Sequence, residues 1–245
     1  MAVGLIELVS GDLPQQKPER NLVIKERIIM PMSNDNQNFS TLKQKYNVAR
    51  NILGKDFMSS EEIEEARGVA YTKEQHVRFI DTLPDQDTLL WCRDKGCMVA
   101  AGPNQPMSFL EVCKLKSEYL KLNAEEWYED EPFALNDKVD TRWLMLGKEP
   151  FLESTGKNWT EQKGLLLPVG AVVPNVTKVV WGVTTYRAVR GESLFSNVYV
   201  RTSSVDLDKG HVDVGSVDGK SLYFYRWDDG SRSRDIGVAY EKECT

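Results

Sequence analysis

The last third of the chain alternates between apolar and polar residues at a period of two, in short runs separated by Gly and Asp. Four such runs occupy residues 197–204, 211–217, 221–227 and 235–241. Alternation at period two between turn residues predicts β-strands, and closely spaced runs predict a mostly antiparallel sheet. Asp218 and Gly219 lie where a two-residue hairpin turn is expected. These residues therefore predict a packed carboxy-terminal sheet.

The stretch before these runs, residues 175–190, allows two interpretations. Its many β-branched residues favour a strand, but about fifteen residues is much longer than a usual strand of roughly five or six. Asn175 can cap a helix and Gly191 can end one. A helical stripe is formed by Val176, Val179, Val183 and Tyr186. We expect a helix that backs the sheet.

The amino-terminal half shows helix signals instead. Ser59 and Glu62 predict a capping box at the start of a helix that ends at Gly68. Thr72 and Asp85 each precede a further helical pattern. The helices expected here and further along cover residues 41–53 (capped by Ser40), 59–68, 73–83, 86–95, a short stretch from Ser108, and part of 154–168. Residues 97–102 and 142–148 read as buried strands. The fold class expected is α+β, with a helical amino-terminal half and a mostly antiparallel carboxy-terminal sheet backed by at least one helix.

The domain plan follows from length and composition. A chain of 245 residues can bury a large core without disulfides or metal. Residues 1–38 mix Pro, Gln and Asn and are expected to be a flexible lead-in. Residues 39–245 are then expected to form a single α+β domain, with a possible sub-boundary near residues 118–140.

The charge distribution indicates which classes of partner the protein can bind. Residues 118–140 hold eight acids and two bases, a difference equal to the whole net charge of −6, whereas ten acids and ten bases follow Pro174. Nucleic-acid binders usually carry a basic stripe, so no nucleic-acid partner is expected.

The longest apolar run, residues 164–173, is too short for a membrane span, and the first residues make a poor signal peptide. We expect a soluble cytoplasmic protein.

The order of several sequence blocks resembles a known group of sequences. The blocks include WCRDKGCMVAAGPNQPMSFLEV, WLMLGKEPFLESTGKNWTEQKGLL and VPNVTKVVWGVTTYRAVRGESLFSNVYVRTSS. They are similar to a family of bacterial reading frames from environmental and uncultured lineages, to which no activity is assigned. The resemblance covers residues 53–242, and implies a bacterial or phage origin and one common architecture. It supplies no mechanism.

Two sets of residues carry side chains of the kinds that bind metal ions. Cys92, Cys97, Cys113 and His76 lack the two close ligand pairs of a zinc site, so buried thiols and a packed histidine are expected. Asp206, Asp208, Asp213 and Lys220 suggest a metal-dependent hydrolase or nuclease, in which carboxylates hold the ion and Lys220 polarises a phosphate. Asp and Gly in hairpin turns explain the same residues. No cofactor or metal is therefore expected, and the hydrolase stays an alternative.

An aromatic row offers a different function. Tyr223, Tyr225 and Trp227 point to one face of a single strand, opposite Leu222 and Phe224. If only one face of the sheet is covered, one of these two sets is exposed, and exposed aromatic rows are typical of interaction surfaces. The leading hypothesis is a non-catalytic binding or interaction module with an unknown protein partner, using Tyr223, Tyr225 and Trp227. The oligomeric state stays open.

Overall fold

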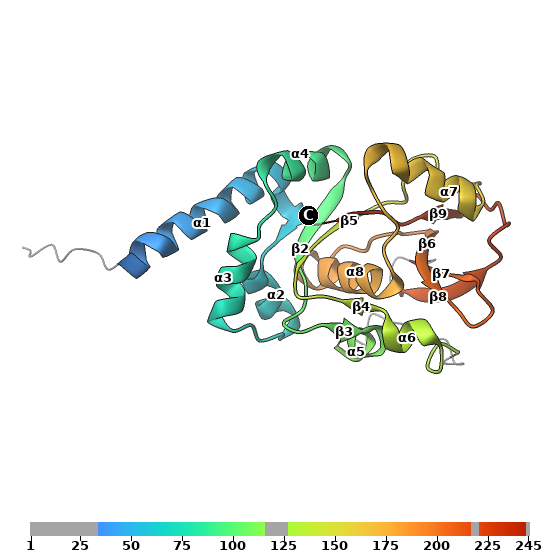
Figure 1. Cartoon of the computed structure of the whole chain (residues 1–245), viewed down its shortest axis with the longest axis horizontal. Helices are drawn as coiled ribbons and strands as arrows, with labels where there is room; N and C mark the ends of the chain where they lie inside the picture. The colour runs from blue at the N-terminus through green and yellow to red at the C-terminus, as the bar shows by residue number, and fades with distance from the viewer. Residues whose placement is uncertain (1–33, 116–126, 217–220, 244–245) are drawn as a thin grey trace, which may run out of the picture.

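The computed structural model describes residues 34–115, 127–216 and 221–243. Most of the expected lead-in, the first part of the 118–140 segment and the Asp218–Gly219 turn lie outside these ranges. The helices of the first half are α1 (Asn34–Leu53), a 3-10 turn η1 (Gly54–Asp56), α2 (Ser60–Arg67), α3 (Lys73–Asp81) and α4 (Gln86–Asp94). They gather at one end of the molecule, and the carboxy-terminal sheet lies at the other (Figure 1). The α+β class is confirmed.

The helix boundaries of the first half follow the caps in the sequence. The Ser59 side chain accepts a hydrogen bond from the Glu62 amide, and the Glu62 carboxylate accepts one from the Ser59 amide. Gly68 ends α2 in the left-handed conformation, with φ of 67°. Thr72 forms the same kind of capping box with Gln75 at the start of α3, and the Asp85 side chain accepts a hydrogen bond from the Thr88 amide at the start of α4. Local hydrogen-bonding chemistry therefore places these helix ends.

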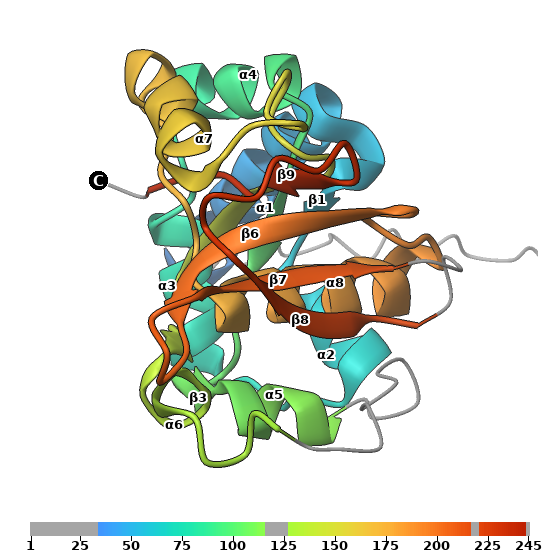
Figure 2. The same ribbon diagram turned by 90° about the vertical axis from the view of Figure 1, so that its right-hand side faces the viewer.

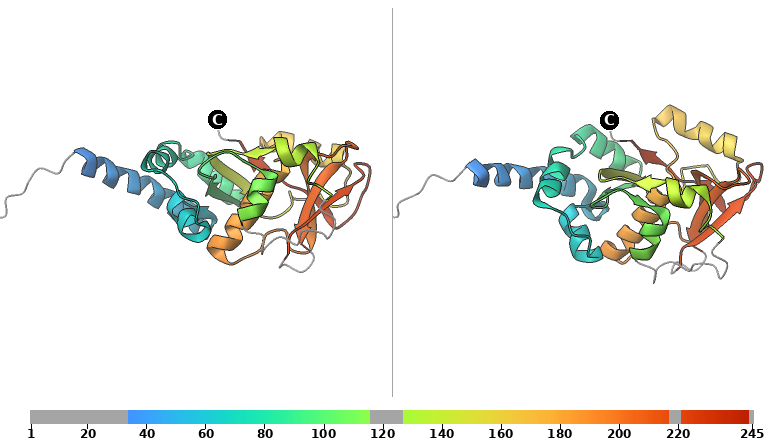
Figure 3. Two further views of the ribbon diagram at one scale, coloured as in Figure 1. Left: turned by 90° about the horizontal axis from the view of Figure 1, so that it is seen from below. Right: turned by 60° about the horizontal axis from the view of Figure 1, so that its bottom comes forward.

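The first helix is longer than expected. It begins at Asn34, so Ser40 lies inside α1 and does not cap it. Asn and Ser cost a helix interior less than about 0.7 kcal/mol each relative to Ala, so they permit continuation as readily as they permit a start. The amino-terminal part of α1 projects from the body of the molecule, while Tyr46, Ala49 and Leu53 are buried against it (Figure 3).

The central sheet has four strands in the order β1 (Phe57–Met58), β2 (Cys97–Ala101), β5 (Trp143–Gly147) and β10 (Glu241–Lys242). Strands β1 and β2 run parallel, and the other two pairs run antiparallel. Every residue of β2 and β5 is buried. A strand that is apolar on both faces is covered on both sides, as the pattern of residues 142–148 predicts.

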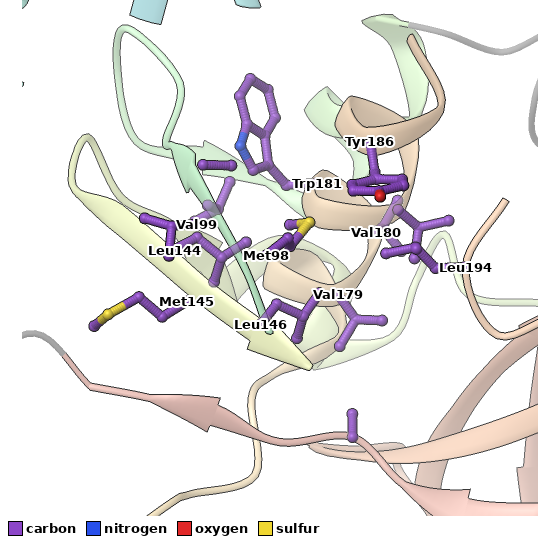
Figure 4. Close-up of a cluster of buried hydrophobic side chains, with 14 of the residues drawn as sticks. Met98, Val99, Leu144, Met145, Leu146, Val179, Val180, Trp181, Tyr186 and Leu194 are labelled. Atoms are coloured by element: carbon purple, nitrogen blue, oxygen red, sulfur yellow. The ribbon is translucent and has the colours of Figure 1, made fainter. Parts of the chain in front are cut away.

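Helix α8 (Val176–Arg190) lies between the two main sheets, and the expected helix is confirmed. The Asn175 side chain caps it and Gly191 ends it with φ of 73°. It contacts β5 of the central sheet and β6 and β7 of the carboxy-terminal sheet. Figure 4 shows Val179 beside Leu146 of β5, and Trp181 donates a hydrogen bond to the Ala101 carbonyl oxygen at the end of β2. A helix packed on several sides must be apolar almost all round, which explains its strand-like composition.

The carboxy-terminal sheet has the order β8 (Tyr223–Trp227), β7 (His211–Ser216), β6 (Val198–Val205) and β9 (Ile236–Val238). Its inner face packs on α8 and, through the ring of Phe224, on Phe109 of α5 (Phe109–Leu115). The inner face buries Val200, Val212, Val214 and Phe224. Figure 2 views the opposite face, with α8 behind the strands.

The last predicted strand, residues 235–241, is divided between the two sheets. Strand β9 pairs parallel with β6, whereas β10 pairs antiparallel with β5. All four predicted runs therefore contribute a strand to this mostly antiparallel sheet, and the end of the last run additionally forms an edge strand of the central sheet. Periodicity identifies extended backbone but carries no information about the pairing partner, and Ala239 and Tyr240 between the two strands are buried as well.

The remaining elements cover the edges. A two-stranded ribbon joins β3 (Met107–Ser108) to β4 (Lys138–Val139), and α6 (Pro132–Asn136) lies beside it. Ser108 and Glu111 form the expected capping interaction at the start of α5. Helix α7 (Trp159–Leu166), capped by Asn158 and followed by a 3-10 turn η3 (Leu167–Val169), lies beside β9.

Candidate interaction face

The side of the β8-β7-β6-β9 sheet that faces away from α8 is called the outer face below. Residues directly opposite each other on neighbouring strands share a face. The register pairs Arg201 with Asp213 and Asp213 with Tyr225, and it pairs Trp227 with His211. The outer face therefore carries Tyr199, Arg201, His211, Asp213, Tyr223, Tyr225 and Trp227.

The structure resolves which side of β8 is core. Leu222 and Phe224 are only 4% and 1% exposed, whereas Tyr225 and Trp227 are each 40% exposed. Tyr223 is half-buried. Phe224 packs against the Phe109 ring at a centroid distance of 5.0 Å. The aromatic row singled out from the sequence is thus the solvent-facing set.

Three tyrosines of the outer face contact one another. The rings of Tyr223 and Tyr225 lie nearly parallel with centroids 6.4 Å apart, and Tyr199 meets Tyr225 edge-on at 5.4 Å. Burial, together with the neighbouring Tyr225 and Tyr223, raises the pKa of Tyr199 to about 12. The Tyr199 phenol therefore stays neutral at physiological pH, and each of the three tyrosines presents an apolar ring with one hydroxyl.

At one end of the outer face, the buried Arg201 side chain holds other segments of the chain against the sheet. Arg201 is fully buried, and its guanidinium donates to the Lys157, Asp228 and Ser231 carbonyl oxygens at 3.2, 3.2 and 3.1 Å. It also donates to the Gln162 side-chain oxygen at 2.9 Å. These bonds fasten α7 and the loop of residues 228–231 onto β6. The sequence signal for this role was a charged residue, Arg201, within the alternating run of residues 197–204, and the sequence reasoning missed it.

The hydrogen bonds from Arg201 to these four groups are called the Arg201 clamp below. Asp213 lies beside this clamp in an unusual electrostatic environment. It is fully buried, its carboxylate is 3.9 Å from Arg201 Nε, and neither oxygen has a hydrogen bond within 3.5 Å among the described residues. Burial raises its pKa to about 8; Arg201 and, at longer range, the Trp227 amide lower it, and Asp229 raises it. Desolvation outweighs the attraction, so this carboxyl is mostly protonated at neutral pH.

His211 sits next to the clamp and is held on two sides. Its Nδ1 is 2.8 Å from Asp229 Oδ1, and its ring stacks on Trp159 of α7 with centroids 3.8 Å apart. A base needs a substrate or nucleophile within hydrogen-bond reach. The contacts found for this ring within the described ranges join it to Asp229 and Trp159, so they orient the loop of residues 228–231.

The residues of the hydrolase alternative separate into different environments. Asp206 accepts hydrogen bonds from the Gly210 amide at 2.7 Å and from Arg226 at 3.1 Å, and Asp208 accepts one from Arg226 at 2.6 Å. Asp213 lies beside the Arg201 clamp, and Lys220 lies outside the described residues. Across the parts of the chain that the structure describes, no three His, Cys, Asp or Glu residues gather as metal ligands.

The three cysteines in the described part of the chain are packed thiols. Cys92, Cys97 and Cys113 are buried and not disulfide-bonded. A hydrogen bond with Cys97, together with burial, raises the pKa of Cys92, and burial raises that of Cys113 to about 12. Thiols held in the protonated form are weak nucleophiles and weak metal ligands.

A further arrangement escaped the sequence reasoning. Ser60 Oγ lies 2.8 Å from His76 Nδ1, and His76 Nε2 lies 3.0 Å from Glu64 Oε2. This is the order of a serine nucleophile, a base and an orienting carboxylate. Ser60 is fully buried, so its hydroxyl is closed to a substrate and the bonds instead join α2 to α3. The spacing of Ser60 and Glu64, one helical turn apart, was the available signal.

No protein-family model, curated protein or solved structure matches the chain. No helix within the described ranges is long and apolar enough to cross a membrane.

Proposed function

We propose that this protein is a non-catalytic interaction module that binds a partner protein through the outer face. The observation that carries the proposal is the exposure of Tyr225 and Trp227, 40% each, on a strand whose other side is core. Tyr and Trp are enriched at protein interfaces because they bring a large, rigid apolar area with a polar tip. The Arg201 clamp supplies the rigid support that such a surface needs.

The strand itself suggests how the partner binds. Within the described residues, β8 pairs only with β7, so its other edge carries backbone groups with no neighbouring strand. The last three residues of β8 are exposed. An extended segment of a partner can add to such an edge, gaining affinity from main-chain hydrogen bonds and specificity from alternate side chains. We infer that Tyr225 and Trp227 would contact alternate side chains of that segment.

The proposal is tested by comparative affinity capture from a bacterial lysate, following the expected origin of the chain. The double substitution Tyr225→Ser with Trp227→Ser removes the aromatic area at positions that pack little, so the variant is expected to fold. Leu152→Ser with Leu167→Ser is the matched control, because these leucines are 79% and 76% exposed and lie elsewhere. We expect a protein retained by the wild type and the control to be lost from the aromatic variant. Identical recovery by all three would reject the outer face as the binding surface.

The alternative, a metal-dependent hydrolase or nuclease using Asp206, Asp208, Asp213 and Lys220, has less support. Arg226 already pairs with Asp206 and Asp208, so a metal ion would have to displace it. The alternative requires magnesium, manganese or calcium to raise the melting temperature, and Asp213→Ala to abolish the rise. Unchanged melting in all three ions would remove it.

A further inference from the structure

The segment between β8 and β9 lies over the outer face. These two strands are at opposite edges of the sheet, so the segment has to cross β7 and β6, as Figure 2 shows. Its first part, the loop of residues 228–231, directly follows Trp227. Two carbonyl oxygens of this loop, those of Asp228 and Ser231, accept hydrogen bonds from Arg201 at 3.2 and 3.1 Å. The position of the loop on the sheet therefore depends on where the Arg201 guanidinium points.

Arg201 donates to neutral groups although a carboxyl lies beside it. A guanidinium has five N–H donors, and four of them serve the oxygen acceptors of the Arg201 clamp. The fifth, on Nε, has no hydrogen-bond partner among the described residues and lies 3.9 Å from Asp213 Oδ1. An ionised carboxylate and a guanidinium normally make direct contact at about 2.7–2.9 Å. The observed arrangement therefore suits a protonated Asp213.

The groups around Asp213 leave an ionised carboxylate there poorly balanced. Arg201 faces it from β6, Tyr225 from the opposite position on β8, and Asp229 from the loop. His211, two residues earlier on β7, is bound to Asp229, and the side chain through which α7 reaches Arg201 is an uncharged amide. Burial raises the pKa of Asp213 to about 8, with Arg201 lowering it and Asp229 raising it. The carboxyl therefore loses its proton at mildly alkaline pH.

We propose that Asp213 is a pH-sensitive switch that controls the position of the loop of residues 228–231. When Asp213 loses its proton, Nε of Arg201 moves toward it by roughly 1 Å to form a charge-assisted hydrogen bond. The planar guanidinium moves as one unit. Its bonds to the Asp228 and Ser231 carbonyl oxygens are already near the long limit of about 3.2 Å for such bonds, so they break. The new negative charge also repels Asp229 in the same loop, and the loop opens.

The direction of the pH effect follows from the two forms of the loop. In the open form water reaches the Asp213 carboxyl, so its pKa returns toward the ordinary value of 3.8, whereas in the closed form it is raised. Closure is therefore fully favoured below about pH 4 and is lost as pH rises to about 8. The consequence for binding rests on the proposed function. Because Trp227 directly precedes the loop, an open loop leaves its ring less firmly held, and the outer face should bind its partner less tightly above pH 8.

The test is hydrogen–deuterium exchange of the full chain between pH 6 and pH 9, followed by mass spectrometry and scaled at each pH to an unstructured reference peptide. Protection of residues 228–231 should fall at least about tenfold between pH 6 and pH 8, while that of α2 stays constant. In Asp213→Asn the protection of the loop should stay within about twofold across the range, because asparagine cannot ionise. Asp208→Asn, at an exposed position, should follow the wild type.

Two outcomes would overturn the switch. One is a wild-type loop whose protection does not change with pH, and the other is an equal fall in Asp213→Asn. Lysate capture that depends on Tyr225 and Trp227, combined with a pH-independent loop, would reject the switch and keep the interaction face. A loop that opens with pH, in a chain that captures no protein, would keep the switch and reject the interaction module.

Discussion

Replacing Asp213 by Asn should stabilise this protein, and the gain should grow with pH. The carboxyl is fully buried, and its pKa is raised from 3.8 to about 8. A group whose pKa is raised on folding binds more protons in the native than in the unfolded state, so stability falls as pH rises from about 4 to 8. Asparagine keeps the shape of the protonated carboxyl and cannot ionise.

The magnitude follows from the size of this pKa shift. Each pKa unit corresponds to 1.36 kcal/mol, so the free energy of unfolding of the variant relative to wild type should increase by up to roughly 4 kcal/mol between pH 5 and pH 8. Relaxation of the site and water entry reduce this ceiling, and we expect at least about 2 kcal/mol. Above pH 8 to 9 the difference should level off.

The assay is urea unfolding followed by tryptophan fluorescence at pH 5, 7 and 9. Asp208→Asn is the control, since its side chain is 77% exposed and should change the pH dependence little. A difference between Asp213→Asn and wild type that is the same at pH 5 and pH 9 would refute the reasoning, as would a variant that is less stable at pH 9.

Three further predictions concern the structural supports. Arg201→Met should break the bonds that hold α7 and residues 228–231, costing about 3 kcal/mol or more and making this loop the first site of limited proteolysis. Gly182→Ala should destabilise by roughly 1–3 kcal/mol in thermal unfolding, because a Cβ there would lie 2.5 Å from Leu146 Cδ2 and 2.8 Å from Met98 Cε. Asn175→Ala should lower the stability by about 1 kcal/mol through loss of the α8 cap, measured by urea unfolding; an unchanged midpoint would contradict the assigned cap.

Much of the helical half was predictable because its signals are local. A capping box needs only Ser59 and Glu62, three residues apart, and both act on backbone groups of the same turn. Helix α8 was predictable for a similar reason, since Asn175 and Gly191 mark its ends. Its burial on several sides was not, because that depends on two sheets that meet only in the folded chain.

The sheet pairings and the candidate sites depended on distant contacts. The pattern of residues 235–241 indicates extended backbone, but the division into β9 and β10 depends on which strands lie nearby. The row at Tyr223, Tyr225 and Trp227 was visible in the sequence, whereas its exposure required the position of α8. The Arg201 bonds join segments separated by many residues, and no spacing within the chain encodes them.

The most direct test of the proposed interaction face is site-specific photocrosslinking. The change Tyr225→p-benzoylphenylalanine places a reactive aromatic group on the outer face, and Leu152→p-benzoylphenylalanine places the same group on an exposed loop. The proposed function predicts a defined crosslinked protein from position 225, mapped by mass spectrometry to an extended segment, and none of that species from position 152. The same crosslinked proteins from both positions, or none from position 225, would contradict it.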